Sequence, residues 1–171
     1  MEQSSYCEVL VKVVPTKLDK ALQRLLWSLC VFFFAAGIVF FLPLLLGTIA
    51  CLVLALVRRH RMKLEYEYQY LDGSLRIDRI IAMSKRKKAG RYELENLAVM
   101  APEGDERLQE YLKRPDLKRV DYSSRVAEAD NRYVMVFHGG GTQYLLLNPT
   151  PEMVQLIWRA APSKVVRKRQ S

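Results

Sequence analysis

Residues 25–57 contain no charged side chain, and this uninterrupted apolar run constrains the fold more than any other feature of the sequence. As a single helix the run would be roughly 50 Å long, whereas the hydrocarbon core of a bilayer is about 30 Å thick. Pro43 provides a break, because proline disrupts the preceding helical turn and is well suited to begin a new helix. We therefore predict a transmembrane helical hairpin with helices at about residues 17–41 and 43–61, and Thr16 as the N-cap of the first helix.

The second predicted helix is short for a bilayer, because its apolar part, residues 44–57, covers only about 21 Å. Arg58, Arg59 and Arg61 would then extend their charged ends toward the head groups. A single strongly tilted helix and a hairpin that enters and leaves through one leaflet are the alternatives. A cleavable signal peptide is disfavoured, since the apolar run is too long and begins too late in the chain.

Basic residues flank the apolar run on both sides. Those before it are Lys12, Lys17, Lys20 and Arg24, and those after it are Arg58, Arg59, Arg61 and Lys63. Positive charge beside a membrane span is typical of the cytoplasmic side, so we predict a multi-pass protein of the cell membrane with both termini in the cytoplasm. The formal net charge of +9 favours an anionic neighbour, and beside a membrane anchor the anionic leaflet is a better candidate than nucleic acid.

After the apolar run the hydrophobic pattern changes to a period of two, which is typical of half-buried strands. Alternating stretches at residues 64–70 and 75–80 flank the Asp-Gly pair at residues 72–73, which predicts a tight hairpin turn. The basic segment at residues 85–88 is interpreted as the next turn, followed by a short strand near residues 91–94. These elements predict a meander of antiparallel strands.

The remaining pattern predicts a strand or a helical turn at residues 93–100, a short helix at 105–113, and strands at 118–122, 133–137 and 143–147. The last two strands are joined by a glycine loop at residues 139–141. Thr150 and Pro151 begin an amphipathic helix in which Met153, Ile157 and Trp158 should be largely buried, and Pro162 ends it. About seven short strands followed by one such helix is the element order of a pleckstrin-homology-like (PH-like) barrel.

The fold class is therefore predicted as an α+β membrane protein, a transmembrane helical hairpin followed by a mostly antiparallel PH-like β domain with a C-terminal helix. The predicted parts are an N-terminal strand or extended segment at residues 1–15, the hairpin at 16–62, the cytoplasmic domain at 63–166 and a basic tail at 167–171. Alternating valines near residues 6–14 favour a strand that pairs with the domain's sheet, and a frayed segment is equally compatible with them.

Residues with the potential for chemistry are few. His60 lies in a basic run and His138 lies beside the glycine loop, so neither is a good catalytic candidate. The three cysteines are too scattered for a disulfide framework or a thiolate metal site. The glycine loop lacks the helix and the lysine of a phosphate-binding loop. We predict that the protein is not an enzyme and that it has no catalytic residue, no cofactor and no metal site.

The candidate binding residues are the basic residues that lie close to the anchor in the sequence. Basic segments at the near end of the domain would lie within a Debye length, about 10 Å, of anionic head groups. The candidates for contact with anionic lipid are Arg58, Arg59, Arg61, Lys85, Arg86, Lys87, Lys88 and Arg91. We predict a membrane-anchored binding module that contacts anionic lipid or a membrane protein partner.

The alternative function is a structural or regulatory subunit of a membrane protein complex that assembles through the hairpin. Gly37, with Ala35 and Ala36, would permit close contact with a partner helix in that case. Liposome binding favours the first hypothesis, and a stable co-purifying membrane protein favours the second.

Several strings of the sequence resemble a known family when they are taken in order. They are EVLVK at residues 8–12, LEYEY at 64–68, GSLRIDRI at 73–80, MSKRK at 83–87, APEG at 101–104, DYSS at 121–124 and APSKV at 161–165. The chain resembles, over nearly its whole length, a small membrane-protein family of Firmicutes named domain of unknown function family 6106. The resemblance implies a bacterial protein with two membrane helices and a cytoplasmic domain, and it implies no catalytic residue. The layout is also similar to bacterial membrane proteins that place a PH-like domain after a two-helix hairpin.

Overall fold

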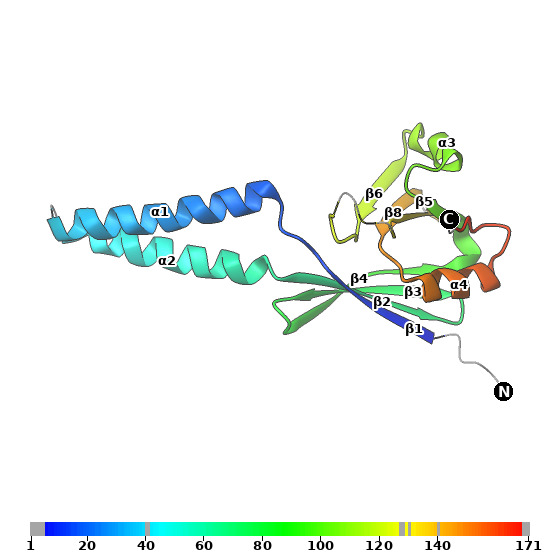
Figure 1. Cartoon of the computed structure of the whole chain (residues 1–171), viewed down its shortest axis with the longest axis horizontal. Coiled ribbons are helices and arrows are strands. Elements are labelled where there is room, and N and C mark those ends of the chain that lie inside the picture. The colour runs from blue at the N-terminus through cyan, green and yellow to red at the C-terminus, as the bar shows by residue number, and fades with distance from the viewer. Residues whose placement is uncertain (1–5, 40–41, 127–128, 130, 140, 169–171) are drawn as a thin grey trace.

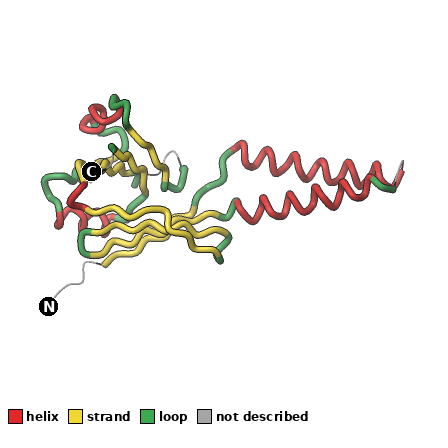
Figure 2. Tube along the Cα trace, turned by 180° about the vertical axis from the view of Figure 1, so that it is seen from behind, coloured by secondary structure: helices red, strands yellow, loops and turns green. Residues whose placement is uncertain are grey.

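Two long helices and a β domain of two sheets make up the protein (Figure 1). The structure is a computed structural model that describes residues 6–39, 42–126, 129, 131–139 and 141–168. The helices α1 (Lys17–Val39) and α2 (Leu44–Arg61) lie side by side and antiparallel, and we call this pair the stalk. Figure 2 shows from behind that the stalk projects from one end of the domain.

The ends of the stalk helices are where the sequence predicts them. Thr16 caps α1, because its Oγ1 accepts a hydrogen bond from the amide of Asp19 while Asp19 Oδ2 accepts one from the amide of Thr16. Pro43 lies immediately before α2, as expected for a residue that separates two helices. Residues 40–41 of the predicted first helix lie outside the described residues.

Small residues hold the two stalk helices together. Gly37 faces α2 so closely that a Cβ at this position would lie 2.7 Å from Cδ2 of Leu45. Gly47 faces Phe33 of α1 in the same way, with a distance of 3.3 Å from its ideal Cβ to the ring. The close helix contact that Gly37 permits is therefore made within the chain, and the interpretation that reserves it for a partner helix is not supported.

The outer surface of the stalk is apolar. Exposed fractions are 67% for Val31, 65% for Phe32 and 71% for Leu46. Because burying apolar surface is strongly favourable, so large an exposed apolar surface indicates a lipid or protein environment. Among the described residues α1 is the one helix that is long and apolar enough to cross a membrane, since α2 carries three arginines in its last turn.

The first sheet is an antiparallel meander in the order β1-β2-β3-β4. Its strands are β1 (Tyr6–Lys12), β2 (Leu64–Leu71), β3 (Ser74–Ile81) and β4 (Lys85–Glu93). The N-terminal segment is thus a strand, paired with β2 from Tyr6 opposite Leu71 to Lys12 opposite Glu65. The stalk is an insertion between two neighbouring strands of one sheet.

The turns of this meander confirm one sequence prediction and correct another. Asp72 and Gly73 have φ values of 44° and 82°, as the predicted tight turn between β2 and β3 requires. The predicted basic turn at residues 85–88 is wrong, because these residues belong to β4. The turn lies earlier, at Ala82 and Met83, with φ values of 55° and 59°. Basic side chains suit β4 because it is an edge strand, and charge on an edge discourages pairing with another chain.

The second sheet has the order β5-β7-β8-β6. Its strands are β5 (Leu97–Pro102), β6 (Leu117–Asp121), β7 (Tyr133–His138) and β8 (Thr142–Leu147). The strand β6 pairs parallel with β8 and the other pairs are antiparallel, so the expected antiparallel character holds with one exception. Short helical turns precede β5 and β6, namely η1 (Leu94–Asn96), η2 (Glu106–Leu108) and α3 (Gln109–Leu112).

The C-terminal helix α4 (Pro151–Ala160) packs against a core shared by the two sheets. Thr150 caps it by accepting a hydrogen bond from the amide of Met153, as predicted. Met153 and Ile157 are each 1% exposed, which confirms their predicted burial. Trp158 packs against the same core but is less completely buried than these two residues, and the guanidinium carbon of Arg167 lies 4.2 Å from the centre of its ring.

A buried tyrosine joins the two sheets within this core. Tyr68 of β2 is completely buried, and its hydroxyl donates a hydrogen bond of 2.5 Å to the carbonyl oxygen of Tyr122. The same hydroxyl accepts a hydrogen bond of 3.4 Å from the amide of Asn148. Because both partners follow strands of the second sheet, Tyr68 fixes the first sheet against the second.

Candidate functional site

The base of the stalk is fixed to both sheets by backbone hydrogen bonds. The amide of Val13 donates to the carbonyl oxygen of Leu64 at 2.9 Å, which extends the pairing of β1 with β2 toward the stalk. The amide of Val14 donates to the carbonyl oxygen of Ser124 at 2.9 Å, in the loop that follows β6. The stalk therefore leaves the domain from a defined position. Clefts flank this junction, and two of them are lined by several arginines.

The larger cleft, which we call the basic cleft, has a volume of about 970 Å³. It lies between the last turns of α2 and the hairpin of β3 and β4. Its cationic side chains are Arg59, Arg61, Lys63, Arg79, Lys85 and Lys87, and His60 also lines it. Leu56 and Val57 give it an apolar wall, and none of its described lining residues is acidic. Such a concentration of positive charge favours an anionic occupant.

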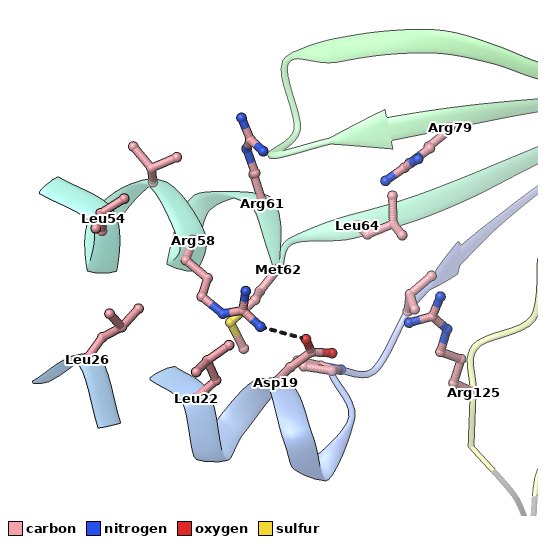
Figure 3. A pocket seen from close by; sticks show the side chains of 13 residues that line it. Asp19, Leu22, Leu26, Leu54, Arg58, Arg61, Met62, Leu64, Arg79 and Arg125 are labelled. Atoms are coloured by element: carbon pink, nitrogen blue, oxygen red, sulfur yellow. Dashed lines mark hydrogen bonds and ion pairs between the residues drawn. The ribbon is translucent and has the colours of Figure 1, made fainter. Parts of the chain in front are cut away.

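The second cleft, which we call the stalk pocket, has a volume of about 480 Å³ and is shown in Figure 3. Leu22 and Leu26 of α1 face Leu54 of α2 across it, and the arginines 61, 79 and 125 line its end near the sheet. Its one acidic lining residue, Asp19, is engaged by Arg58 in an ion pair of 3.1 Å.

The structure divides the eight predicted lipid-contact residues between two faces of the first sheet. Arg59, Arg61, Lys85 and Lys87 line the basic cleft, and Arg58 lines the stalk pocket. The remaining three lie on the opposite face of β4. Alternation along the strand places Arg86 and Lys88 there, and the register shift between Ile77 and Asp78 brings Arg91 to the same face. Of these, Arg86 forms an ion pair of 2.7 Å with Glu67, Arg91 forms one of 2.8 Å with Glu93, and Lys88 lies opposite Asp78 in the register. Contact with lipid remains a prediction for all eight.

Sequence reasoning missed Arg79 and Arg125, which come from β3 and from the loop after β6. One signal for Arg79 was present, since it follows the buried Leu75 and Ile77 at alternate positions of the same strand. A charged residue at a position on the same face of the strand as two buried residues indicates that this end of the strand has left the core and faces a cleft. Arg125 carries no comparable signal, because its position depends on a loop.

The basic tail lies apart from both clefts. Figure 1 places the C-terminus at the end of the domain away from the stalk. Lys164 Nζ donates to the carbonyl oxygen of Glu95, and Arg167 stacks on Trp158. Residues 169–171 lie outside the described residues, as does Gly140 of the predicted glycine loop.

The outer face of the first sheet holds a buried carboxyl group. Glu67 is 3% exposed, and burial, together with a hydrogen bond to the Glu8 carboxyl, raises its pKa above the ordinary value for glutamate. The positive charge of Arg86 acts in the opposite direction. The pKa of Glu8 is lowered by its hydrogen bonds to Glu67 and Tyr6. Of the two carboxyl groups, Glu67 therefore binds a proton more readily than Glu8.

This pair predicts a specific pH dependence of stability. Between the ordinary glutamate pKa, about 4.3, and the raised pKa of Glu67, the folded protein binds more protons at this site than the unfolded chain. The unfolding free energy contributed by Glu67 should therefore fall as pH rises through this interval. Glu67→Gln should lack this fall, and Glu152→Gln, at an exposed position, should behave as the parent. Urea unfolding at a series of pH values above the ordinary glutamate pKa measures the difference, and identical profiles for all three chains would contradict the assignment.

The domain consists of a four-stranded meander packed on a second sheet, with a C-terminal helix against the core that the sheets share. This arrangement defines a PH-like domain. In this protein a stalk is inserted into the first sheet, and the junction of the stalk with the domain is basic. Residues 3–167 match the bacterial PH-like domain family known as domain of unknown function 6106, and the chain belongs to this family. The match includes the stalk as well as both sheets. No curated protein and no solved structure matches the chain.

Proposed function

We propose that the protein is a membrane-anchored, non-enzymatic binding module in which the stalk crosses the bilayer and the PH-like domain contacts anionic lipid at the cytoplasmic face. PH-like domains commonly bind lipids or proteins, which agrees with a binding role. The observation that carries the proposal is the basic cleft, because it combines six cationic side chains with no acidic lining residue among those described and opens beside the apolar stalk.

The pairing of β1 with β2 supports two crossings of the membrane rather than one. A single crossing would place these strands on opposite sides of the bilayer, and their seven paired residues could not meet. The length of α1, 23 residues or about 35 Å, fits a crossing. The helix α2, 18 residues or about 27 Å, would have to place the arginines of its last turn at the head groups. Arg58, in the last turn of α2, forms an ion pair with Asp19. This pairing neutralises the charge of the arginine and so lowers the free-energy cost of placing it near the head groups.

The first test concerns topology. Reporters fused to either terminus should be found in the cytoplasm, because both chain ends lie on the domain side of the stalk in Figure 1 and both flanks of the apolar run are basic. A fluorescent protein and alkaline phosphatase, each placed at each end, measure this directly. An N-terminal reporter outside the cytoplasm would contradict the two-crossing arrangement.

The second test concerns the basic cleft itself. Each lysine near an anionic surface contributes about 1 kcal/mol, so Lys85→Gln with Lys87→Gln should weaken docking of the domain on the membrane by roughly 30-fold. The full chain, reconstituted in vesicles that contain phosphatidylglycerol, reports docking as energy transfer from a dye on the domain to labelled head groups. Added salt should reduce transfer in the parent and have little effect in the variant.

The matched control for this test is Lys113→Gln with Lys118→Gln. Both lysines are exposed and lie outside the lining of the described clefts, on or beside the segment of α3 and β6. This variant has the same net charge as the cleft variant but should dock like the parent. Equal loss in both variants would show a general effect of net charge and contradict a role for the cleft.

A further inference from the structure

The stalk pocket has two chemically different ends. Its outer walls are apolar side chains from both stalk helices, with exposed fractions of 42% for Leu22, 59% for Leu54 and 46% for Val57. Its inner end near the sheet is lined by arginines of α2, of β3 and of the loop after β6. The apolar walls continue into the exposed surface of the stalk, so the pocket opens toward the region where acyl chains would lie.

The arginines at the inner end have little to neutralise them. Among the described residues, neither Arg61 nor Arg79 has an ion-pair partner, and Arg125 approaches Asp121 only to 3.8 Å. The single acidic lining residue, Asp19, already pairs with Arg58 at 3.1 Å. Positive charge in excess of carboxylate at the end of a pocket favours an anion with several acceptor oxygens, for which the planar guanidinium group is well suited.

Two of these arginines flank the inner end of the pocket. Burial raises the pKa of the neighbouring Tyr66 hydroxyl, the charges of Arg79 and Arg125 act in the opposite direction, and the carboxylate of Asp121 acts with burial. Figure 3 shows Arg79 and Arg125 on either side of the pocket's inner end, with Leu64 between them. An oxyanion at this end therefore has cations on two sides.

We propose that the stalk pocket binds one anionic phospholipid of the cytoplasmic leaflet, with its phosphate between Arg79 and Arg125 and an acyl chain against Leu22 and Leu54. This site rests on the proposed membrane position of the stalk. It shares Arg61, Arg79 and Val57 with the basic cleft, but Arg125 lines only the stalk pocket, whereas Lys85 and Lys87 line only the basic cleft. A soluble anion would leave the apolar walls uncovered, and an uncharged lipid would leave the arginines without acceptors. An anionic phospholipid satisfies both ends of the pocket.

The test counts lipids bound to the full chain. The protein is reconstituted in nanodiscs of phosphatidylcholine and phosphatidylglycerol, transferred to mild detergent, and analysed by native mass spectrometry. The parent should retain one phosphatidylglycerol per chain in preference to phosphatidylcholine. Arg79→Gln with Arg125→Gln should lower the retained fraction at least ten-fold, and both residues are exposed, so the change leaves the core intact.

A second variant tests the apolar walls without any change of charge. Val57→Trp places a bulky side chain in the pocket and should lower phosphatidylglycerol retention to a similar extent. Val53→Trp is its matched control, because Val53 lies one turn earlier on the same helix, is 52% exposed and does not line the pocket. The control should retain phosphatidylglycerol like the parent.

The outcomes separate this site from the proposed function. A chain that stays in the membrane during carbonate extraction but retains no phosphatidylglycerol, or retains it equally in Arg79→Gln with Arg125→Gln, overturns the site alone. Displacement of the lipid by excess inorganic phosphate also overturns it, since the pocket would then be a phosphate site. Lys85→Gln with Lys87→Gln should keep the bound lipid while losing salt-sensitive docking. A chain that is released by carbonate contradicts the proposed function itself.

Discussion

A chain that begins at residue 63 should fail to form a stable domain, although it contains seven of the eight described strands. The missing segment, β1 with the residue that follows it, contributes Val9, Val11 and Val13 to the core, each 8% exposed. Burial of a valine side chain stabilises a fold by about 1.5–3 kcal/mol, so these three together contribute roughly 5–9 kcal/mol. This is comparable to the whole stability of a small domain, about 5–15 kcal/mol. Circular dichroism during urea titration measures the loss.

The matched chain keeps β1 and loses the stalk. Replacing residues 15–62 with a short glycine-containing turn joins Val14 to Lys63, which lie two positions beyond the paired Lys12 and Glu65 in the same register. This stalkless domain should be soluble and unfold cooperatively, because the core residues of both sheets are retained. A synthetic peptide of residues 6–14 should also restore folding to the chain that begins at 63, and the same peptide with Val9→Asp and Val11→Asp should not. Cooperative unfolding of the shorter chain without the peptide would show that β1 is dispensable.

Local patterns were sufficient to predict most of the elements. The uncharged run and Pro43 predicted both stalk helices to within a few residues, because so long a stretch without charge is typical of helices in an apolar environment and proline separates one helix from the next. Alternation of apolar and polar residues predicted the strands on either side of the Asp-Gly turn. The turn itself was predictable because it requires left-handed backbone angles, which aspartate and glycine tolerate.

The error at residues 85–88 has a physical reason. The prediction takes four consecutive basic residues as the mark of a turn, but lysine and arginine have no preference for turn backbone angles. These residues can instead occupy an edge strand, because their side chains reach water there. The actual turn uses Ala82 and Met83 in left-handed conformations, which neither residue favours. The turn is held in place by the pairing of β3 with β4 and by a hydrogen bond of 2.7 Å from the amide of Ala82 to the carbonyl oxygen of Lys63. Neither contact is visible in local sequence.

The candidate site was the least predictable part. Its basic residues from α2 and β4 were visible as charge close to the apolar run, whereas Arg79 and Arg125 join them only after β3 and the loop following β6 meet the base of the stalk. The parallel pairing of β6 with β8 is equally hard to predict from local sequence, since it joins strands that are distant in the chain. Such placements are set by tertiary packing, so a pattern of neighbouring residues carries no information on them.

Trp158 shows the limit of a pattern inside a well-predicted helix. With 3.6 residues per turn, Ile157 lies about 40° from Met153 around the helix axis, whereas Trp158 lies about 140° away. The buried stripe of Met153, Val154 and Ile157 therefore leaves Trp158 at its margin, half-buried beneath Arg167. The sequence predicts Trp158 to be largely buried together with Met153 and Ile157, and its angular position explains why it is less completely buried than they are.

Ile157→Ala should consequently cost more stability than Trp158→Ala, although tryptophan is the larger residue. Ile157 is 1% exposed in the core between the sheets and α4, and replacing a buried isoleucine with alanine costs about 2–5 kcal/mol through lost burial and the cavity left behind. Trp158→Ala should cost less, because part of the ring already faces solvent and the groups around it can relax.

Urea unfolding of the stalkless domain, followed by circular dichroism, measures both changes without depending on tryptophan fluorescence. Gln155→Ala on the exposed face of α4 is the control and should lie within about 0.5 kcal/mol of the parent. If Ile157→Ala also unfolds like the parent, α4 does not close the core and the packing of the helix against the two sheets is contradicted. If Trp158→Ala is instead the more damaging change, the stacked Arg167 and the chain after α4 contribute more to the domain than the buried stripe does.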